Sequence, residues 1–367
     1  MGEPYVGILV NDTLYEGIPQ GKTNNEAISY YRDAAMQYGV IPAYFRIQDV
    51  ISADTLKVTA IIQRGHICTL ELIDLPKVIH NRAIYLDHRS YQIMESWIKR
   101  GILIFNRWNR YSKLLIHQLL MKDEVIRPHL PGTYPATLHN VKQMMQAYDS
   151  LIIKPTNSSI GRGVMKLDRI RTGWKLIYPK SMKLTNKTWN TMRFRKTVPT
   201  LLRTKISRRA YIVQQRLPLA TYDGRPFDLR ISVQRGAGGD WQITGIVAKV
   251  ASRKLFLTNV AQGGAVMTLP AILAEEYPNL DAAQVCQQIA DFSLRVARHL
   301  SRELPHMADM GLDIGITKDG YPLFIECNGK DQRYSFREAG MMEEWRATYY
   351  NPIAYAKYLL DGGTPVY

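Results

Sequence analysis

The stretch Gly311–Asp331, GLDIGITKDGYPLFIECNGKD, predicts two antiparallel strands joined by a tight turn. Apolar residues alternate along both halves, and the Lys-Asp-Gly triplet at 318–320 is typical of a hairpin turn. Because side chains alternate between the two faces of a strand, Glu326 and Asn328 share one face, and Asp313 can meet them from the neighbouring strand. Two carboxylates and an amide are oxygen ligands that Mg²⁺ takes together with phosphate and water. The alternative is a hairpin whose polar face is only hydrated.

The composition is that of an ordinary globular chain. With 367 residues, 46% of them hydrophobic and 22% charged, it has the length for one large domain or two to three smaller ones. No apolar run reaches the roughly 18–20 residues of a membrane span, and the opening lacks the basic region of a signal peptide, so we expect no membrane partner. Cys68, Cys286 and Cys327 are few and irregularly spaced, which predicts a reducing, cytoplasmic setting without a disulfide or zinc site. Alternation turns Cys327 away from the polar face, as a buried thiol.

The net charge of +16 is concentrated in one segment. Residues 166–209 contain fourteen Lys and Arg and a single acid, Asp168, and so carry +13 of the total. Such a local excess predicts an anionic partner: an acidic polymer, nucleic acid or phosphates. Four aromatic residues lie among the basic ones: Trp174, Tyr178, Trp189 and Phe194. Single-stranded nucleic acid is therefore a rival to an acidic polymer, and a solvated basic face is the further alternative.

Residues 1–105 are predicted to form an open α/β domain. Hydrophobic patterns indicate two helices and several strands: helices at 25–39 and 91–100, strands at 5–10, 41–45, 58–63, 67–72, 77–80 and 102–105. Asn11 and Asp12 follow the first strand, where a dinucleotide-binding domain would carry a glycine fingerprint. No nicotinamide site is therefore expected.

The remainder of the chain is also predicted to mix helices and strands. Strands are expected at 151–155, 164–167, 211–215, 227–234 and 241–251, and helices at 109–121, 141–148, 284–304 and 345–360. The helix at 284–304 has the clearest apolar periodicity.

A loop rich in serine and glycine follows the strand that ends at Lys154. Its sequence, TNSSIGRG at 156–163, can place backbone N–H groups against phosphate oxygens, and the Lys154 ammonium adds positive charge. The pattern GxxxxGK[ST] is absent and the loop joins strand to strand, so it is not a P-loop. A purely structural glycine hairpin is the alternative.

A second polar pattern lies on the strand at 227–234. Alternation places Asp228 and Arg230 on one face, and an arginine held by its neighbouring aspartate would clamp a phosphate or an oxyanion. A structural ion pair is the alternative. The following strand carries Lys249 and leads into a polar turn formed by Asn259, Gly263 and Gly264.

Taken in order, these residues resemble the ATP-grasp superfamily. The order is Lys113, Lys154 with its glycine loop, 211–217, Asp228-x-Arg230, Asn259 with Gly263-Gly264, and Asp313 with Glu326-x-Asn328. The spacing of Asp313 and Glu326 matches that family's metal ligands, and the Asp-x-Arg strand is similar to the branch that ligates glutamate onto protein C-termini. The opening PYVGILV and the overall spacing look more specifically like the YheC/YheD group of endospore coat-associated ATP-grasp proteins.

The resemblance implies an α/β architecture. Two α+β subdomains of the ATP-grasp fold would clamp ATP, preceded by the open α/β N-terminal domain at 1–105. The ATP-grasp domain would occupy 106–367, with 148–218 as a mobile lid subdomain that contains the basic insert 166–209.

The resemblance also implies roles by position. Asp313, Glu326 and Asn328 would hold one or two Mg²⁺ ions, while Arg230 and Lys154 would be the catalytic residues. The residues that contact ATP would be Lys113, Lys154, Ser158, Ser159, Gly161, Gly163, Gln214, Gln215, Arg216, Leu217, Asp228, Lys249, Asn259, Gly263 and Gly264.

The sequence departs from the family pattern at a few positions. Gln214 and Gln215 stand where many relatives have a ribose-binding glutamate, and Asp223 is the candidate to replace it. Gly311 and Leu257 stand where many relatives have an arginine, so we expect the acceptor to be handled differently.

The chemistry implied is ligation of a carboxylate. The carboxylate would react with ATP to form an acyl phosphate, which an amine or thiol then attacks. Such a reaction needs positioning and charge neutralisation rather than a serine or cysteine nucleophile. The expected partners are a small-molecule or peptide carboxylate, an amine, and an acidic polymer at the basic insert, with action during sporulation in the mother cell or at the spore coat. The alternatives are a coat structural or interaction protein that retains ATP binding, and an ATP-grasp kinase.

Overall fold

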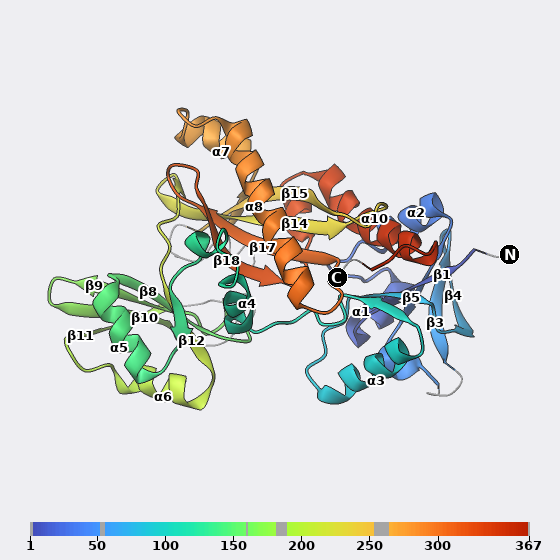
Figure 1. Cartoon of the computed structure of the whole chain (residues 1–367), viewed down its shortest axis with the longest axis horizontal. Helices are drawn as coiled ribbons and strands as arrows, with labels where there is room; N and C mark the ends of the chain where they lie inside the picture. The colour runs from blue at the N-terminus through green and yellow to red at the C-terminus, as the bar shows by residue number, and fades with distance from the viewer. Residues whose placement is uncertain (1–2, 52–55, 159–160, 181–188, 253–263, 366–367) are drawn as a thin grey trace.

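Three β-sheets follow one another along the length of the molecule (Figure 1). The structure is a computed structural model that describes residues 3–51, 56–158, 161–180, 189–252 and 264–365. The N-terminal sheet lies at one end, the second sheet at the other, and the third sheet between them (Figure 1). Within the described ranges, no helix has both the length and the apolar character needed to cross a membrane.

The N-terminal sheet is built from the first six strands, with helices between some of them. Their bounds are β1 Tyr5–Leu9, α1 Asp12–Gly17, η1 Ile18–Gln20, α2 Ile28–Tyr38, β2 Ile41–Phe45, η2 Ile47–Asp49, β3 Lys57–Arg64, β4 Ile67–Asp74, β5 Val78–Asn81, α3 His88–Lys99 and β6 Leu103–Phe105. The strand order is β4-β3-β2-β1-β5-β6; β1, β2, β5 and β6 pair in parallel, and β3 and β4 extend one edge as a hairpin. The strands and helices predicted for this region are confirmed with small shifts at their ends. Helix α2 ends, as predicted, at Gly39, whose φ of 60° suits a helix C-cap.

The second sheet is antiparallel, and two helices cover one of its faces. Its elements are β7 Thr133–Pro135, α5 Leu138–Ala147, β8 Ser150–Pro155, β9 Met165–Ile170, β10 Gly173–Pro179, β11 Trp189–Phe194, α6 Thr200–Arg208 and β12 Tyr211–Gln215, in the strand order β11-β10-β9-β8-β12-β7. Val141 of α5 and Leu202 of α6 share a buried core with Leu167 and Trp174. The opposite face, which carries Lys154, is left uncovered by these helices.

The basic segment is more structured than predicted. It supplies most of β9, the whole of β10 and α6, and the described part of the edge strand β11. Trp174 and Leu176 are buried, whereas Lys175 between them is half-buried. The alternation of a strand is therefore present, but lysine and arginine at the outward positions hide it from a hydrophobicity pattern.

The third sheet carries the predicted hairpin at its edge. Its strands are β13 Thr221–Tyr222, β14 Arg225–Arg235, β15 Trp241–Val250, β16 Ala265–Met267, β17 Asp309–Ile316 and β18 Pro322–Asn328, in the order β16-β15-β14-β17-β18, with β13 paired to β14. The helices and turns around it are α4 Lys113–Leu120, η3 Arg127–His129, α7 Leu269–Glu276, α8 Ala282–Glu303, α9 Tyr334–Glu338 and α10 Met342–Leu360. Leu229 and Ile231 of β14 pack into one core with Ile289 and Val296 of α8. Asp228 and Arg230 therefore lie on the face turned away from α8, as alternation predicts.

A buried ionic cluster joins the N-terminal sheet to the third sheet. Oδ2 of Asp309 on β17 lies 2.6 Å from Arg333, 3.5 Å from Arg82 and 3.3 Å from Nε2 of His80. Arg82 also pairs with Glu26 at 2.6 Å. Burial alone would raise the pKa of the Glu26 carboxyl, but Arg82 and Arg333 lower it to about 2. We call these five residues the junction cluster.

Candidate active site

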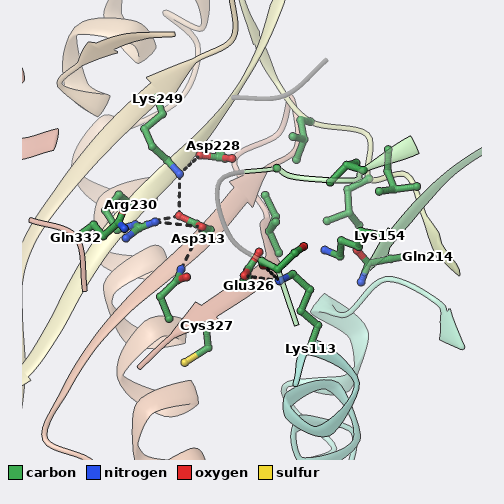
Figure 2. Close-up of a pocket in the computed structure, with 18 of the residues that line it drawn as sticks. Lys113, Lys154, Gln214, Asp228, Arg230, Lys249, Asp313, Glu326, Cys327 and Gln332 are labelled. Atoms are coloured by element: carbon green, nitrogen blue, oxygen red, sulfur yellow. Dashed lines mark hydrogen bonds and ion pairs between the residues drawn. The ribbon is translucent and has the colours of Figure 1, made fainter. Parts of the chain in front are cut away.

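A cavity of about 600 Å³ separates the second sheet from the third. Strands β8 and β12 line one wall, β14, β15, β17 and β18 line the other, and the start of α4 and the segment after β18 contribute the remainder. The predicted site residues that line it are Lys113, Lys154, Ser158, Gly161, Gln214, Gln215, Arg216, Leu217, Asp228, Arg230, Lys249, Asp313, Glu326 and Asn328. The fold thus brings together residues from one helix and six strands, together with the loops between them; Figure 2 shows many of these side chains pointing toward one another.

A few predicted residues are not part of this lining. Ser159, Asn259 and Gly263 lie outside the described residues, as does Leu257. Gly163 and Gly264 are described but do not line the cavity.

The register of the third sheet places the two predicted metal-binding carboxylates side by side. Asp313 is paired with Glu326 across β17 and β18, and Gly311 with Asn328. The register shifts between Asp313 and Ile314, so strict alternation fails there. Ile325 and Cys327, which the pattern assigned to the apolar face, are both part of the cavity lining, and Cys327 also packs in the core. Such a bulge redirects side chains locally, here at the edge of a binding site.

Asp313 is surrounded by cations. Its Oδ1 accepts hydrogen bonds from Arg230 Nε at 3.0 Å and Lys249 Nζ at 2.8 Å, and its Oδ2 lies 3.4 Å from the Asn328 side-chain nitrogen. Burial alone would raise the pKa of Asp313, but Arg230 and Lys249 hold it well below its usual range. The carboxylate is therefore ionised at neutral pH, as a metal ligand must be.

The prediction that Asp228 holds Arg230 is wrong, because each of the two residues pairs with a different partner. Arg230 pairs with Asp313 and with Asp331 Oδ1, at 3.0 and 3.1 Å, and Asp228 pairs with Lys249 at 2.8 Å (Figure 2). The pairings form across strands, because Arg230 lies opposite Asp313 on β17 and Asp228 opposite Lys249 on β15. Spacing along a single strand gives no information about these partners.

The second carboxylate, Glu326, is held from the other side. Lys113 Nζ lies 2.9 Å from Glu326 Oε1 and donates a hydrogen bond to the Ser158 carbonyl at 2.5 Å. Lys154 is 7% exposed and points into the same space (Figure 2). Burial lowers the pKa of Lys154 to about 8, although the nearby Glu326 opposes this shift, so Lys154 is still mostly protonated at neutral pH. Among the described residues, seven lysines and arginines and three carboxylates thus line the cavity, an arrangement suited to an anionic ligand.

The described part of the glycine loop is held by cations through its carbonyl groups. The Asn157 carbonyl accepts hydrogen bonds from Arg110 at 2.9 Å and Arg209 at 3.1 Å, and the Ser158 carbonyl accepts one from Lys113. Binding of phosphate by the backbone N–H groups of this loop stays a prediction. Gly161 and Gly163 have φ of 62° and 74°, a conformation that glycine adopts without strain.

The two glutamines at 214–215 are anchored by their neighbours. The Gln214 side chain donates to Thr133 Oγ1 at 2.8 Å, and Gln215 Oε1 accepts from the Gly132 backbone at 3.3 Å. Asp223, the candidate replacement for a ribose-binding glutamate, lies 3.5 Å from Arg225 and does not line the cavity.

Asp331 and Ser232 were missed by sequence reasoning. Asp331 is fully buried, binds Arg230, and accepts a hydrogen bond from Ser232. A Cβ at Gly311 would collide with Asp331 Oδ1, which explains why this position has no side chain. The sequence contains a pattern that could have predicted both residues: Ser232 continues the alternation of Asp228 and Arg230, and Asp331 follows three residues after Asn328.

The donor set fits a magnesium ion that is delivered with phosphate. Among the residues the structure describes, no three His, Cys, Asp or Glu side chains gather into a group that could hold a metal. Asp313, Glu326 and Asn328 offer two carboxylates and an amide along one wall. Mg²⁺ is commonly held by one or two carboxylates and completes its coordination with phosphate oxygens and water.

Comparison with known proteins identifies the fold and the family. Two curated relatives come from Bacillus subtilis (strain 168): endospore coat-associated protein YheD, 24% identical over 310 residues that cover 79% of this chain, and endospore coat-associated protein YheC, 22% identical over 325 residues, 85% of this chain and 86% of YheC. This chain covers only 64% of YheD.

Solved structures with a similar fold include ATP-grasp ligase PsnB with a minimal precursor and D-cycloserine synthetase DcsG. PsnB matches with a TM-score of 0.53 and 13% identity, covering 93% of this chain and 95% of PsnB; DcsG matches with a TM-score of 0.52 and 9% identity, covering 97% and 99%. The model of the YheC/D-like ATP-grasp family matches residues 101–359. The chain belongs to the YheC/D-like ATP-grasp family.

Proposed function

We propose that this protein is an ATP-dependent ligase that activates a carboxylate as an acyl phosphate and transfers the acyl group to an amine or thiol. The observation that carries the proposal is the pairing of Asp313 with Glu326 in one cavity wall, within reach of Lys113, Lys154, Arg230 and Lys249. Cations placed beside carboxylates suit a ligand that brings both negative charge and a divalent ion, as ATP with Mg²⁺ does.

The nucleotide roles follow the walls of the cavity. Residues 214–217 would receive the adenine, largely through backbone groups. Lys113 and Lys154 would bind phosphate oxygens, and Ser158, Gly161 and Gly163 would cover them. We also propose as nucleotide contacts Ser159, Asn259, Gly263 and Gly264. Asp313, Glu326 and Asn328 would hold one or two Mg²⁺ ions, which when bound neutralise charge on the β- and γ-phosphates.

The protein's own side chains would position the substrate carboxylate and neutralise the charge on the transferred phosphoryl group. A carboxylate oxygen of the substrate attacks the γ-phosphorus, the bond from that phosphorus to ADP breaks, and Arg230 steadies the transferred phosphoryl group with Lys154. The nucleophile then attacks the acyl carbon, and phosphate leaves with the bonding electrons. Cys327 is buried, and burial raises the pKa of its thiol well above the usual range, so it is not the nucleophile.

The lid, residues 148–218, would recruit an acidic partner. Lys166, Lys175 and Arg193 lie on the sheet face opposite the helices, because they share alternation with Ile152, which lines the cavity. An extended acidic chain would meet positive charge along its path to the cavity. PsnB, whose fold is similar, has been solved with a precursor peptide. The relatives' names point to the endospore coat, so we propose action in the mother cell during sporulation, in the cytoplasm or at the coat.

The rival functions differ in product. A kinase on the same scaffold would release a stable phosphorylated compound, and an interaction protein would bind ATP without consuming it. The test is ATP consumption with pooled amino acids and acidic peptides, followed by mass spectrometry. ADP together with an amide or thioester supports the ligase; a phosphorylated product, or no consumption with any mixture, contradicts it.

A further inference from the structure

One cation in the cavity has no task in the nucleotide chemistry proposed above. Lys330 lies in the segment after β18, at the end of the cavity that Asn109, Arg110, Gln332 and Tyr334 also line. Across the described parts of the chain, Lys330 has no hydrogen bond or ion pair, unlike Lys113 and Lys249. Lys330 is therefore a half-buried residue of the cavity lining, and no anion among the described residues is bonded to its ammonium.

The backbone on both sides of Lys330 is held rigidly. The Gly329 carbonyl accepts a hydrogen bond from the Asn106 side chain at 2.7 Å, and a Cβ at Gly329 would lie 2.8 Å from the Cα of Asn109. The Asp331 carbonyl accepts from Arg82 at 3.0 Å, and the Asp331 carboxylate binds Arg230 at 3.1 Å. The backbone that carries Lys330 is therefore preorganised, which lowers the entropy cost of binding a ligand.

The charges behind Lys330 do not balance it. The junction cluster contains two carboxylates, and each already has a close arginine: Glu26 with Arg82, and Asp309 with Arg333, both at 2.6 Å. Lys330 adds a further positive charge near Glu26, which already has Arg82 as its partner. A partly buried charge without a bonded partner is costly, and an anion from the cavity would relieve that cost.

Lys330 is separate from the phosphate-binding cations. The charged groups that act on Lys330 are Arg82, Glu26 and Arg333, whereas those that act on Lys154 are Glu326, Lys113 and Asp313. The cavity thus offers two positions for negative groups, one at the carboxylate pair and one at Lys330.

We infer that the carboxylate substrate is a diacid: one carboxylate lies beside Arg230 for activation, and Lys330 binds the other. The inference rests on the proposed function and specifies its substrate class. It assigns Lys330 to substrate recognition.

The first test measures protection of lysines from acetylation by N-acetoxysuccinimide, quantified by mass spectrometry. The full chain is loaded with Mg²⁺ and a non-hydrolysable ATP analogue, and succinate, glutarate and adipate are each compared with the monoamide of the same acid. We expect at least one diacid to slow acetylation of Lys330 about tenfold, and its monoamide not to. Equal acetylation of Lys330 with every diacid and its monoamide would overturn the inference.

The same experiment tests nucleotide binding, on which the proposed function depends, separately from diacid binding. The ATP analogue alone should protect Lys113 and Lys154, whatever happens at Lys330. If these two lysines stay unprotected, the nucleotide assignment fails; if they are protected while no diacid protects Lys330, only the diacid assignment fails.

Variants distinguish recognition from structural support. We expect Lys330→Met to weaken binding of the protecting diacid by about tenfold or more, measured by calorimetry on protein loaded with Mg²⁺ and the ATP analogue, and to leave ATP affinity and the melting temperature unchanged. Lys318→Met, in the exposed turn between β17 and β18, is the matched control and should behave as wild type. A marked fall in melting temperature for Lys330→Met, with diacid binding intact, would identify Lys330 as a counterion of Glu26 and overturn the inference.

Discussion

Strand β17 carries two aspartates that serve different regions of the molecule. Asp309 belongs to the junction cluster and is 0% exposed, with Arg333, Arg82 and His80 around it. Asp313 lies further along the same strand, at the cavity, with Arg230 and Lys249 as partners. Both are carboxylates among cations, but only the cations of Asp313 can reach a ligand. Access from the cavity, more than residue type, therefore decides whether an ion pair supports binding or holds two sheets together.

The largest expected effect separates the two regions by activity. Glu326→Gln removes a carboxylate at the cavity, so we expect ATP turnover to fall on the order of 10²–10³-fold or more, because charge on the phosphates is no longer neutralised in place. The free energy of unfolding should change little, since Glu326 is partly exposed. Asp319→Asn, in the exposed hairpin turn, is the control. Unchanged ATP consumption in Glu326→Gln counts against the assignment.

The next largest effect is a loss of stability when the junction cluster is disrupted. Asp309→Asn leaves Arg333 and Arg82 buried without their shared carboxylate, which should lower the free energy of unfolding by about 3–5 kcal/mol. Urea denaturation measures this. Asp361→Asn breaks an exposed pair with Lys357 and should cost less than about 1 kcal/mol. Equal losses in both variants would mean that the junction cluster does not hold the sheets together.

A smaller effect appears as pH dependence. Burial lowers the pKa of His80 to about 4, although the nearby Asp309 opposes this, so the folded protein keeps His80 neutral where the unfolded chain binds a proton. The unfolded state then holds more protons between about pH 6.5 and 4, and stability falls as the pH is lowered through that range. From pH 7 to 4.5 the His80 contribution is about 2 kcal/mol.

Comparison of variants isolates that contribution. In His80→Gln, the loss of unfolding free energy between pH 7 and 4.5 should be smaller than in wild type by this amount. His139→Gln, at an exposed position, should keep the wild-type loss. The same pH dependence in all three proteins would show that His80 is not held neutral by the fold.

The smallest effect sharpens the comparison within the active site. A side chain at position 311 collides with Asp331, so Gly311→Ala should displace the second anchor of Arg230. We expect turnover to fall about tenfold and the unfolding free energy by about 1–2 kcal/mol, as for mild overpacking. A Cβ at Gly238 would meet only Asp240 Oδ2, at 4.0 Å, so Gly238→Ala should be neutral in both measurements. A neutral Gly311→Ala would show that Asp331 does not set the position of Arg230.

The sequence predicted the parts of the site that depend on local spacing. The strands β17 and β18, the faces of Asp228 and Arg230, and the place of Lys154 at the end of β8 are confirmed, as is the ATP-grasp fold. The partner of Arg230 and the cavity-facing Ile325 were not predictable in the same way. They depend on cross-strand register and on a bulge, which short-range patterns do not record.

Two further regions were missed for physical reasons. Strands β10 and β11 each have one basic residue at an outward position, Lys175 and Arg193, and these charges interrupt the apolar pattern. The junction cluster joins Glu26 and Arg82 to Asp309 and Arg333, residues far apart in the chain that only the tertiary structure brings into contact.

The most direct test of the central claim is calorimetric titration of ATP into wild type and Asp313→Asn, each with and without Mg²⁺. If Asp313 and Glu326 hold the ion that accompanies the nucleotide, wild type will bind ATP about tenfold or more tightly when Mg²⁺ is present, and Asp313→Asn will lose most of that gain. An ATP affinity that is indifferent to Mg²⁺ in wild type, or an equal gain in the variant, would contradict the account.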